Sequence, residues 1–476
     1  MTEIGGIIKG ENMLDIRKTC SACGNRIALL SDSGEAKTYE ELVTFADGFA
    51  AAVPSHSLVF ILAENSFGAV MGYVACLLHE CVPLLLNSAT EASQLRHLCE
   101  VYTPSYIWLP DVNSSIGDSY TAIFKASGYT LLQTGYKPFD LHSDLALLLS
   151  TSGSTGSPKL VRLSRQNVHS NAESIAQYLQ ITAEERPITS LPLYYSFGLS
   201  VINSHLLRGA TILLTKYSVS DSEFWQFARE QHATSLSGVP YTWQMLKQLR
   251  FMRMQTPDLR TLTQAGGKLS PELAKEYIDW AAANGKRFYV MYGQTEATAR
   301  MSYLPWDVAA EKPGSIGVAI PNGRFELRDM DGIAISEPDK QGELVYYGPN
   351  VSMGYAQKSE DLLLGDCNNG CLHTGDIAML DSDGDYYIVG RMKRFLKIFG
   401  LRIGLDEVER LILSHFDTDC YCCGTDEKLH VKVTNPDVAG QIPLFLEQQI
   451  HLFRQYIQIS VVEKILRNEV GKVIAQ

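Results

Sequence analysis

The sequence predicts an α/β fold in which a large N-terminal region precedes a small C-terminal domain, and three observations support this prediction. Short apolar runs alternate with longer amphipathic runs from about residue 27 to about residue 350, as expected where helices are layered on sheets. At 476 residues the chain is too long for one simple core. Near residue 390 this alternation gives way to a basic segment, so we expect domains at 1–390 and 391–476.

The apolar runs predict secondary structure in the order of the chain. We expect strands at 57–62 and 82–87 on either side of a helix at 68–80. Further strands are expected at 105–110, 145–150, 210–215 and 287–293. Each run is followed by a turn or a polar loop, and such folds bind their ligands at the carboxyl ends of the strands. The loops after these strands are therefore where functional residues are expected.

Composition and charge exclude several classes of protein. The chain has 41 basic and 53 acidic residues, a formal net charge of −12, which argues against a nucleic-acid binder. The N-terminus lacks the apolar core of a signal peptide, and the apolar stretch 67–86 is interrupted by His79, Glu80 and Pro83. We therefore expect a cytoplasmic protein without a membrane span.

The ten cysteines fit the same compartment as reduced thiols. Cys20 and Cys23 form a single CxxC, and Cys420, Cys422 and Cys423 cluster near the C-terminus. No second CxxC lies at zinc-ribbon spacing, so free thiols are favoured over a structural zinc site for both groups.

The strongest local signal for chemistry is the loop 151–159, TSGSTGSPK, which directly follows the strand expected at 145–150. Small residues let backbone N–H groups wrap around a polyanion, hydroxyls add donors, and the lysine adds a positive charge. The loop does not fit the Walker A pattern, so a classical P-loop ATPase is excluded, and no GxGxxG supports a Rossmann dehydrogenase. A flexible Ser/Gly linker is the alternative interpretation of this loop alone.

Four further segments could complete a nucleotide site. In Tyr292-Gly293-Gln294-Thr295-Glu296 the aromatic ring can stack on a base, and Thr295 and Glu296 can hold magnesium between phosphates. Asp376, in Thr374-Gly375-Asp376, can accept hydrogen bonds from ribose hydroxyls. The basic run that begins at Gly390-Arg391 and the terminal Gly471-Lys472 would alone be read as solvent-exposed segments.

In this order and at these spacings, the five segments resemble the adenylate-forming superfamily of acyl-CoA synthetases, nonribosomal-peptide adenylation domains and luciferases. The stretch GELVYYGPNVSMGY (342–355) resembles another segment of that family. The resemblance implies two β-α layered subdomains and a distorted β-barrel, followed by a small mobile α+β domain with its hinge near Lys393. It also implies ATP and Mg²⁺ as ligands.

The resemblance implies a role for each matching residue. The phosphates of ATP would be held by Thr151, Ser152, Gly153, Ser154, Thr155, Gly156 and Lys159. Adenine would lie between Gly267 and Tyr292, and the ribose would bind Asp376 and Arg391. Thr295 would contact the α-phosphate region, Glu296 would bind Mg²⁺, and Lys472 would bridge the carboxylate and the α-phosphate. Gly400 would lie beside the tunnel of the acceptor thiol.

Side chains near residue 195 bear on the acid substrate. Tyr195 stands where acyl-CoA synthetases often have a histidine, and no acidic residue lies between Phe197 and His205 to pair with a substrate ammonium. This disfavours an α-amino acid and favours an acyl or aryl acid. The acyl pocket is expected to be formed by Tyr195, Ser196, Val239, Gly266 and Met291.

The resemblance thus implies an ATP-dependent ligase that forms acyl-AMP from a carboxylic acid and passes the acyl group to a thiol. Coenzyme A is favoured as the acceptor, with the phosphopantetheine of a separate carrier protein as the alternative. Val470 replaces the small hydroxyl residue usual before the terminal lysine, and the C-terminal domain is short for the family. A nucleotide-binding scaffold that has lost catalysis is the alternative of a different class, and the retained charged residues argue against it.

Overall fold

A computed structural model describes residues 16–111, 120–150, 159–392, 394–398, 401–425, 427–450, 452–467 and 473. The chain packs into two compact units. The first unit comprises Met1–Pro313, Ala319–Arg324 and Tyr347–Leu372, and the second comprises Gly314–Val318, Phe325–Tyr346 and His373–Gln476. Helices and sheets are combined throughout, so the predicted α/β class is confirmed.

The first unit contains an eight-stranded sheet in the order β20-β9-β8-β4-β3-β5-β7-β6. Its strands are β3 (Leu58–Ala63), β4 (Val82–Asn87), β5 (Tyr106–Pro110), β6 (Thr121–Ala126), β7 (Tyr129–Gln133), β8 (Leu145–Ser150), β9 (Leu160–Ser164) and β20 (Gly354–Ala356). Strand β3 pairs in parallel with both β4 and β5, and β4 pairs in parallel with β8. The strands predicted at 57–62, 82–87, 105–110 and 145–150 are therefore present.

Helices cover this sheet, and the most apolar of them is the most deeply buried. They include α1 (Ile16–Cys23), α2 (Tyr39–Ala50), α3 (Phe67–Leu78) and α4 (Ala92–Tyr102). Helix α3 confirms the helix predicted at 68–80, and its residues from Gly68 to Cys76 are all buried. A helix that is apolar on all sides is expected in the interior.

The same unit contains a nine-stranded sheet in the order β16-β15-β14-β13-β12-β10-β11-β1-β2. Its strands are β1 (Ile27–Ser31), β2 (Ala36–Thr38), β10 (Pro187–Ile188), β11 (Ile212–Leu214), β12 (Ser235–Gly238), β13 (Thr261–Gln264), β14 (Arg287–Tyr292), β15 (Ser302–Tyr303) and β16 (Val318–Ala319). Strands β12, β13 and β14 are parallel neighbours. Strands β11 and β14 correspond to the runs predicted at 210–215 and 287–293.

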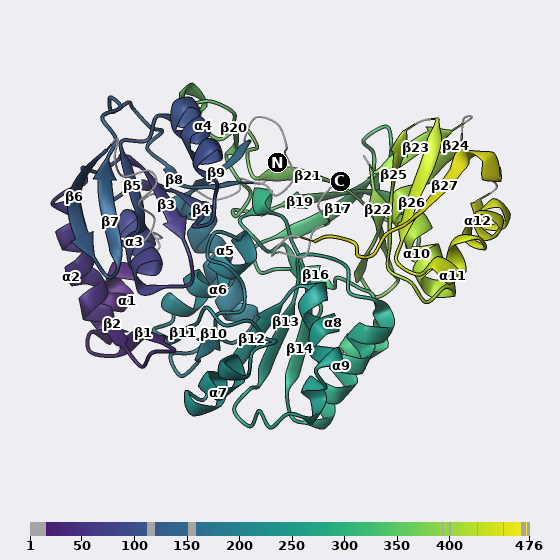
Figure 1. The fold of residues 1–476 in the computed structure, drawn as a ribbon, viewed down its shortest axis with the longest axis horizontal. Helices are drawn as coiled ribbons and strands as arrows, with labels where there is room; N and C mark the ends of the chain where they lie inside the picture. The colour runs from purple at the N-terminus through teal and green to yellow at the C-terminus, as the bar shows by residue number, and fades with distance from the viewer. Residues whose placement is uncertain are drawn as a thin grey trace, which may run out of the picture. The chain divides into compact units, whose positions relative to one another are not determined.

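Two helices in the middle of the first unit lie between these two sheets (Figure 1). They are α5 (Arg165–Tyr178) and α6 (Ser196–Leu206). Helix α5 follows β9 without a loop, because Ser164 and Asn167 each accept a hydrogen bond from the other's backbone N–H, at 3.1 and 2.8 Å. The remaining helices of the unit are α7 (Ser222–Glu230), α8 (Pro240–Gln248) and α9 (Pro271–Ala283).

The second unit is built on a five-stranded sheet in the order β18-β17-β19-β21-β22. Its strands are β17 (Arg324–Arg328), β18 (Ala334–Ile335), β19 (Gln341–Tyr347), β21 (Cys371–Leu380) and β22 (Tyr386–Arg391). Two smaller sheets follow, formed by β23 (Phe395–Ile398) with β24 (Leu401–Gly404), and by β25 (Cys420–Thr425), β26 (Lys428–Val433) and β27 (Ile457–Val461). Helices α10 (Leu405–His415), α11 (Pro436–Ala439) and α12 (Ile442–Ile450) complete the unit.

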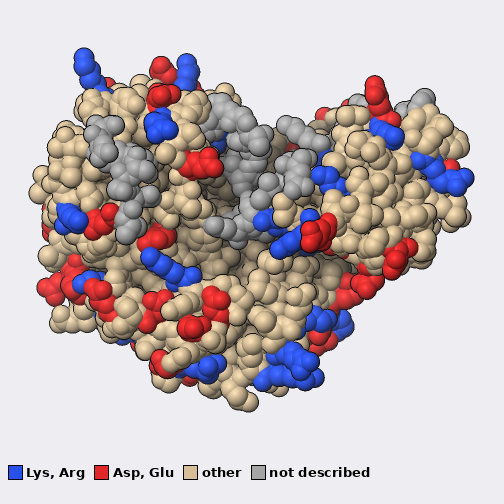
Figure 2. Space-filling model, viewed as in Figure 1, with Lys and Arg blue, Asp and Glu red and all other residues tan. Residues whose placement is uncertain are grey.

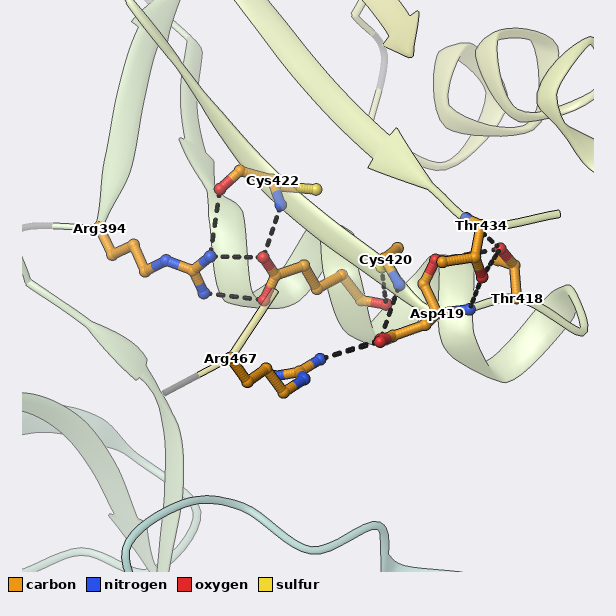
Figure 3. A network of polar contacts seen from close by, with 8 residues as sticks. Arg394, Thr418, Asp419, Cys420, Cys422, Thr434 and Arg467 are labelled. Carbon is orange, nitrogen blue, oxygen red and sulfur yellow. Dashed lines mark hydrogen bonds and ion pairs between the residues drawn. The ribbon is translucent and has the colours of Figure 1, made fainter. Parts of the chain in front are cut away.

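The small sheets and helices of the second unit share an apolar core that runs from Leu396 to Ile457 in sequence. Beside this core, the guanidinium of Arg394 donates to the carboxylates of Asp406 and Glu409. It also donates to the carbonyl oxygen of Cys422 (Figure 3). Glu409 also accepts the backbone N–H of Cys422 at 2.6 Å. The segment before β23 is thereby tied to α10 and β25.

Acidic and basic side chains are interspersed on the face drawn in Figure 2, and the coloured residues there form no extended area of one sign. Within the described ranges, no helix combines the length and the apolar character needed to cross a membrane.

Candidate active site

The predicted phosphate loop connects two antiparallel strands of the eight-stranded sheet. Strand β8 ends at Ser150 and β9 begins at Leu160, and these two residues are paired. Thr151, Ser152, Gly153, Ser154, Thr155 and Gly156 lie outside the described residues. Lys159, immediately before β9, is half-buried, and its ammonium lies 3.3 Å from the centre of the Tyr355 ring. Strand β20 places this ring, because Tyr355 pairs with Val161 of β9.

Tyr355 also contacts the predicted magnesium ligand. Its hydroxyl donates to Glu296 Oε1 at 2.8 Å, and the backbone N–H of Ser352 donates to the carbonyl oxygen of Glu296 at 2.9 Å. Burial, and then the negative charge of Glu296, raise the pKa of Tyr355 well above its usual range, so the phenol remains a proton donor. The structure therefore brings Lys159 and Glu296 to one aromatic ring. Sequence reasoning missed Tyr355, although the GELVYYGPNVSMGY segment ends on it.

Two hydroxyls meet next to this cluster. Thr295 lies in η3 (Thr295–Ala297), which follows β14, and Ser196 is the first residue of α6. Their side-chain oxygens are 3.2 Å apart. Ser196 was expected in the acyl pocket, and here it contacts the residue expected at the α-phosphate. Ser196 and Thr295 therefore place two hydroxyl groups side by side where α6 meets η3.

The predicted adenine residues follow two neighbouring parallel strands. Gly267 lies shortly after β13, and Tyr292 ends β14, where Gln294 donates to its hydroxyl at 3.3 Å. Because β13 and β14 are parallel and paired, their carboxyl ends meet at one edge of the sheet. Gly293 is required next to Tyr292, since a Cβ there would lie 1.8 Å from the carbonyl oxygen of Ala299.

Three of the predicted pocket residues converge. A Cβ on Gly266 would lie 2.4 Å from the hydroxyl of Tyr195 and 3.1 Å from a methyl of Val239, and its φ of +82° also favours glycine. Burial raises the pKa of Tyr195 to about 12, against a smaller opposing effect of Arg300, so this side chain is a neutral phenol. Met291 is buried in β14, and its sulfur accepts the hydroxyl of Tyr178 at 3.0 Å.

The predicted ribose residues are paired in the second unit. Asp376 in β21 is opposite Arg391 in β22, and the Arg391 Nε lies 2.8 Å from Asp376 Oδ1. The aspartate is only 2% exposed, whereas the arginine side chain is 60% exposed. The backbone N–H of Asp376 donates to Thr374 Oγ1 at 3.1 Å, and Gly375 between them has a φ of +70°.

Three predicted residues, Lys393, Gly400 and Lys472, lie outside the described part of the chain, and so does Val470. Within the described part, no cluster of three or more His, Cys, Asp or Glu side chains is suited to hold a metal ion. All ten cysteines are free. Burial raises the pKa of Cys20 to about 12, so this thiol is protonated at neutral pH.

Comparison with known proteins identifies a family. A family model described as AMP-binding enzyme matches residues 16–356. An oxalate–CoA ligase of Arabidopsis thaliana is 32% identical over 279 residues, which is 58% of this chain and 53% of the relative. A 2-succinylbenzoate–CoA ligase of Bacillus subtilis is 27% identical over 476 aligned positions, with 94% of each chain covered. The chain thus spans about half the length of the plant relative and nearly all of the bacterial one.

Solved structures agree with this fold. The o-succinylbenzoate CoA synthetase of Bacillus subtilis, in complex with its acyl-adenylate intermediate, superposes with a TM-score of 0.77 at 23% identity, covering 96% of both chains. ATP-bound MatB from Rhodopseudomonas palustris has a TM-score of 0.78 at 22% identity, covering 97% of both chains. At this level of identity the agreement concerns the architecture.

Proposed function

The chain belongs to the AMP-binding enzyme family, and we propose that it activates a carboxylic acid with ATP and then transfers the acyl group to a thiol. The observation that carries the proposal is the meeting of Lys159 and Glu296 at the ring of Tyr355, beside the hydroxyls of Thr295 and Ser196. A cation, a carboxylate and hydroxyl donors at the ends of β-strands suit a nucleoside triphosphate. The family resemblance likewise implies that Lys159, Glu296 and Thr295 bind the phosphates and their magnesium ion.

The residues present fit a magnesium ion. The Tyr355 hydroxyl donates a hydrogen bond to Oε1 of Glu296. The other carboxylate oxygen, Oε2, has no hydrogen bond within the described residues. Mg²⁺ prefers oxygen ligands and is commonly held by one or two carboxylates together with substrate phosphates. Glu296 would hold the ion, which when bound would neutralise charge on the phosphates.

In the first half-reaction the substrate carboxylate attacks the α-phosphorus of ATP. A C–O–P anhydride bond forms and the bond between the α- and β-phosphates breaks, releasing pyrophosphate. Two anions must be brought together, so Lys159 and the loop 151–156 would bind the β- and γ-phosphates, and Thr295 would orient the α-phosphate. Asp376 and Arg391 would hold the ribose, Gly267 and Tyr292 the adenine, and Lys472 would bridge the two reacting groups.

In the second half-reaction a thiol attacks the acyl carbon, AMP departs and the thiol proton is lost to solvent. Coenzyme A is the acceptor we propose, because relatives at 27–33% identity are named as CoA ligases or CoA synthases. By the family resemblance, the domains would be 1–390 and 391–476 with the hinge near Lys393, and Gly400 would lie beside the thiol tunnel. Transfer to a separate carrier protein is the second candidate. Ten free cysteines support a reducing, cytoplasmic location.

ATP–pyrophosphate exchange across a panel of carboxylic acids, without coenzyme A, tests the proposal. We expect acid-dependent exchange that requires Mg²⁺ and falls strongly in Lys159→Met. Lys216→Met is a matched control, because Lys216 is an exposed lysine of the same unit, 2.7 Å from Glu64. Absence of exchange with every acid, in a protein that binds ATP, would favour the catalytically degenerate scaffold. Adding coenzyme A or a phosphopantetheinylated carrier to the active acid then identifies the acceptor.

A further inference from the structure

Two fully buried arginines in the first unit differ in how their charges are satisfied. Arg162 is 0% exposed, and its guanidinium donates to the backbone carbonyl oxygens of Met353, Tyr355, Leu364 and Gly365. Arg300 is 1% exposed, yet only its Nη1 donates, to the hydroxyl of Tyr178 at 3.0 Å and to the sulfur of Met291 at 2.9 Å. Its Nε is buried without any partner. No carboxylate of the described residues forms an ion pair with Arg300.

A buried guanidinium without a counter-ion is costly, because arginine remains protonated and the protein interior solvates charge poorly. The guanidinium of Arg162 holds the segment 353–365, which includes β20, against β9. The charge of Arg300 makes no comparable set of contacts with the described residues. An unsatisfied buried polar group requires a physical explanation, and a bound ligand, ion or water molecule is one.

Arg300 lines a narrow cavity with Glu185, His205, Ser237 and Thr263, and it is the one guanidinium among the lining residues. Glu185 is the one carboxylate among the lining residues, and it is already paired with Arg260 at 2.9 Å. Burial lowers the pKa of His205 to about 4, so this ring is neutral at pH 7. Burial likewise raises the pKa of Tyr178 and keeps it neutral. The one carboxylate of the lining is thus paired with Arg260 rather than with Arg300, and neither His205 nor Tyr178 supplies a negative charge.

Arg300 also adjoins the proposed acyl pocket. Its guanidinium carbon lies 4.7 Å from the centre of the Phe197 ring, and that ring is 6.3 Å from the ring of Tyr195. Its Nη1 also donates to the sulfur of Met291, a residue expected in the pocket. The charge of Arg300 therefore lies beside residues of the proposed pocket.

We propose that Arg300 is a specificity-determining residue that selects a dicarboxylic acid, binding the carboxylate that is not activated. The proposal rests on the function proposed above and names its substrate class. The free Nε–H and Nη2–H groups form the fork that binds a carboxylate through two hydrogen bonds. The cavity has room for about one water molecule, which a carboxylate would have to displace, so the group that enters must be compact and the acid short.

Matched pairs of acids in ATP–pyrophosphate exchange test this proposal: succinate against butyrate, and glutarate against valerate. The wild-type enzyme should favour the diacid of a pair in kcat/KM. Arg300→Met should lower kcat/KM for the diacid about 10- to 100-fold and leave the monoacid nearly unchanged, because only the charge-assisted contact is lost. Arg300→Lys should keep part of the preference. Arg208→Met is the control, because Arg208 lies two residues after the end of α6 and pairs with Glu173 at the surface.

Exchange that favours the monoacids in the wild-type enzyme, or an unchanged ratio in Arg300→Met, would overturn the selection of diacids while leaving the proposed function established. No exchange with any acid would reject the proposed function itself. Thermal unfolding provides a second test. Removing an unmatched charge should leave the melting temperature of acid-free Arg300→Met unchanged or raised, whereas a loss of several degrees would mean that Arg300 is structural. The wild-type ratio decides even where the variant does not fold.

Discussion

Tyr355 contacts two side chains of opposite charge through different parts of one ring. The π-face lies against the ammonium of Lys159, and the hydroxyl holds one oxygen of Glu296. The first contact depends only on the aromatic face, and the second only on the hydroxyl. The two contributions can therefore be separated by removing a single oxygen atom.

Tyr355→Phe should keep the position of Lys159 and release the carboxylate of Glu296. We expect a weaker apparent affinity for Mg²⁺ and a decrease of about tenfold in the rate of pyrophosphate exchange, the scale of one hydrogen bond to a charged group. Titration of exchange activity with Mg²⁺ measures this. Exchange and Mg²⁺ dependence identical to wild type would show that Tyr355 does not position Glu296. Tyr217→Phe, at an exposed tyrosine of the same unit, is the control.

His205 makes the stability of the protein depend on pH. It is buried, and its Nδ1 lies 2.8 Å from the carbonyl oxygen of Val201. Burial lowers its pKa from 6.5 to about 4, while Glu185 opposes this shift and Arg300 adds to it. Between these two pKa values the unfolded chain binds more protons than the native one, so stability falls as the pH is lowered from 6.5 toward 4.

His205→Gln should remove up to about 3 kcal/mol of this pH-dependent change in the free energy of unfolding. Urea denaturation at pH 7, 6, 5 and 4.5 measures the difference between the slopes of wild type and variant. His232→Gln is the control, since that ring is 71% exposed. Equal slopes in wild type and His205→Gln would refute the assignment.

At the residue scale, the sequence predicted a functional role only for residues that lie in a recognisable local segment. Glu296 and Lys159 could be proposed because each follows an apolar strand within a recognisable segment. Tyr355 and Arg300 could not, because their roles come from contacts between segments 59 to 196 positions apart, or from a missing counter-charge. The pattern of apolar residues along the chain predicts neither contacts between distant segments nor the absence of a counter-charge.

At the scale of elements, strands formed by an apolar run were predictable, whereas exposed or hydroxyl-rich strands were not. Strand β3 reads LVFILA and is buried throughout, so its apolar run is unmistakable. Strand β6 is a mostly exposed edge strand that reads TAIFKA, and β12 and β13 are buried yet rich in Ser and Thr. Their hydroxyls line the cavity beside Arg300, which explains why a buried strand there lacks an apolar run.

The polar network of Arg394 predicts how the second unit responds to mutation. Glu409 is 17% exposed and depends on Arg394, so Arg394→Met would leave a largely buried carboxylate without its cation (Figure 3). We expect a loss of about 2 kcal/mol, less than for a fully buried pair because the arginine is 26% exposed. Chemical denaturation of the full chain measures this. Arg410→Met, on the exposed face of α10, should cost under about 0.5 kcal/mol, and equal effects of the two variants would contradict the assignment.

At the scale of the whole molecule, the two compact units contain different parts of the proposed site. Lys159, Glu296 and the pocket residues belong to the first unit, whereas Asp376 and Arg391 belong to the second. The apolar core around Leu396 and Ile457 draws only on residues of the second unit. The two half-reactions differ in the charge that must be neutralised, and Lys472 offers a way to separate them.

Lys472→Ala should impair the first half-reaction and spare the second. The lysine ammonium would offset the charge that builds up when the carboxylate attacks the α-phosphorus, and losing such a group costs at least about 10²-fold in rate. Thiol attack on an acyl-AMP that is already formed has no need of it. We therefore expect pyrophosphate exchange to collapse while a chemically synthesised acyl-AMP still yields acyl-CoA at a near-normal single-turnover rate. Lys464→Ala, at another lysine close to the C-terminus, should preserve both activities. Equal losses in both half-reactions would indicate that Lys472 supports the fold, and normal exchange would remove it from the catalytic site.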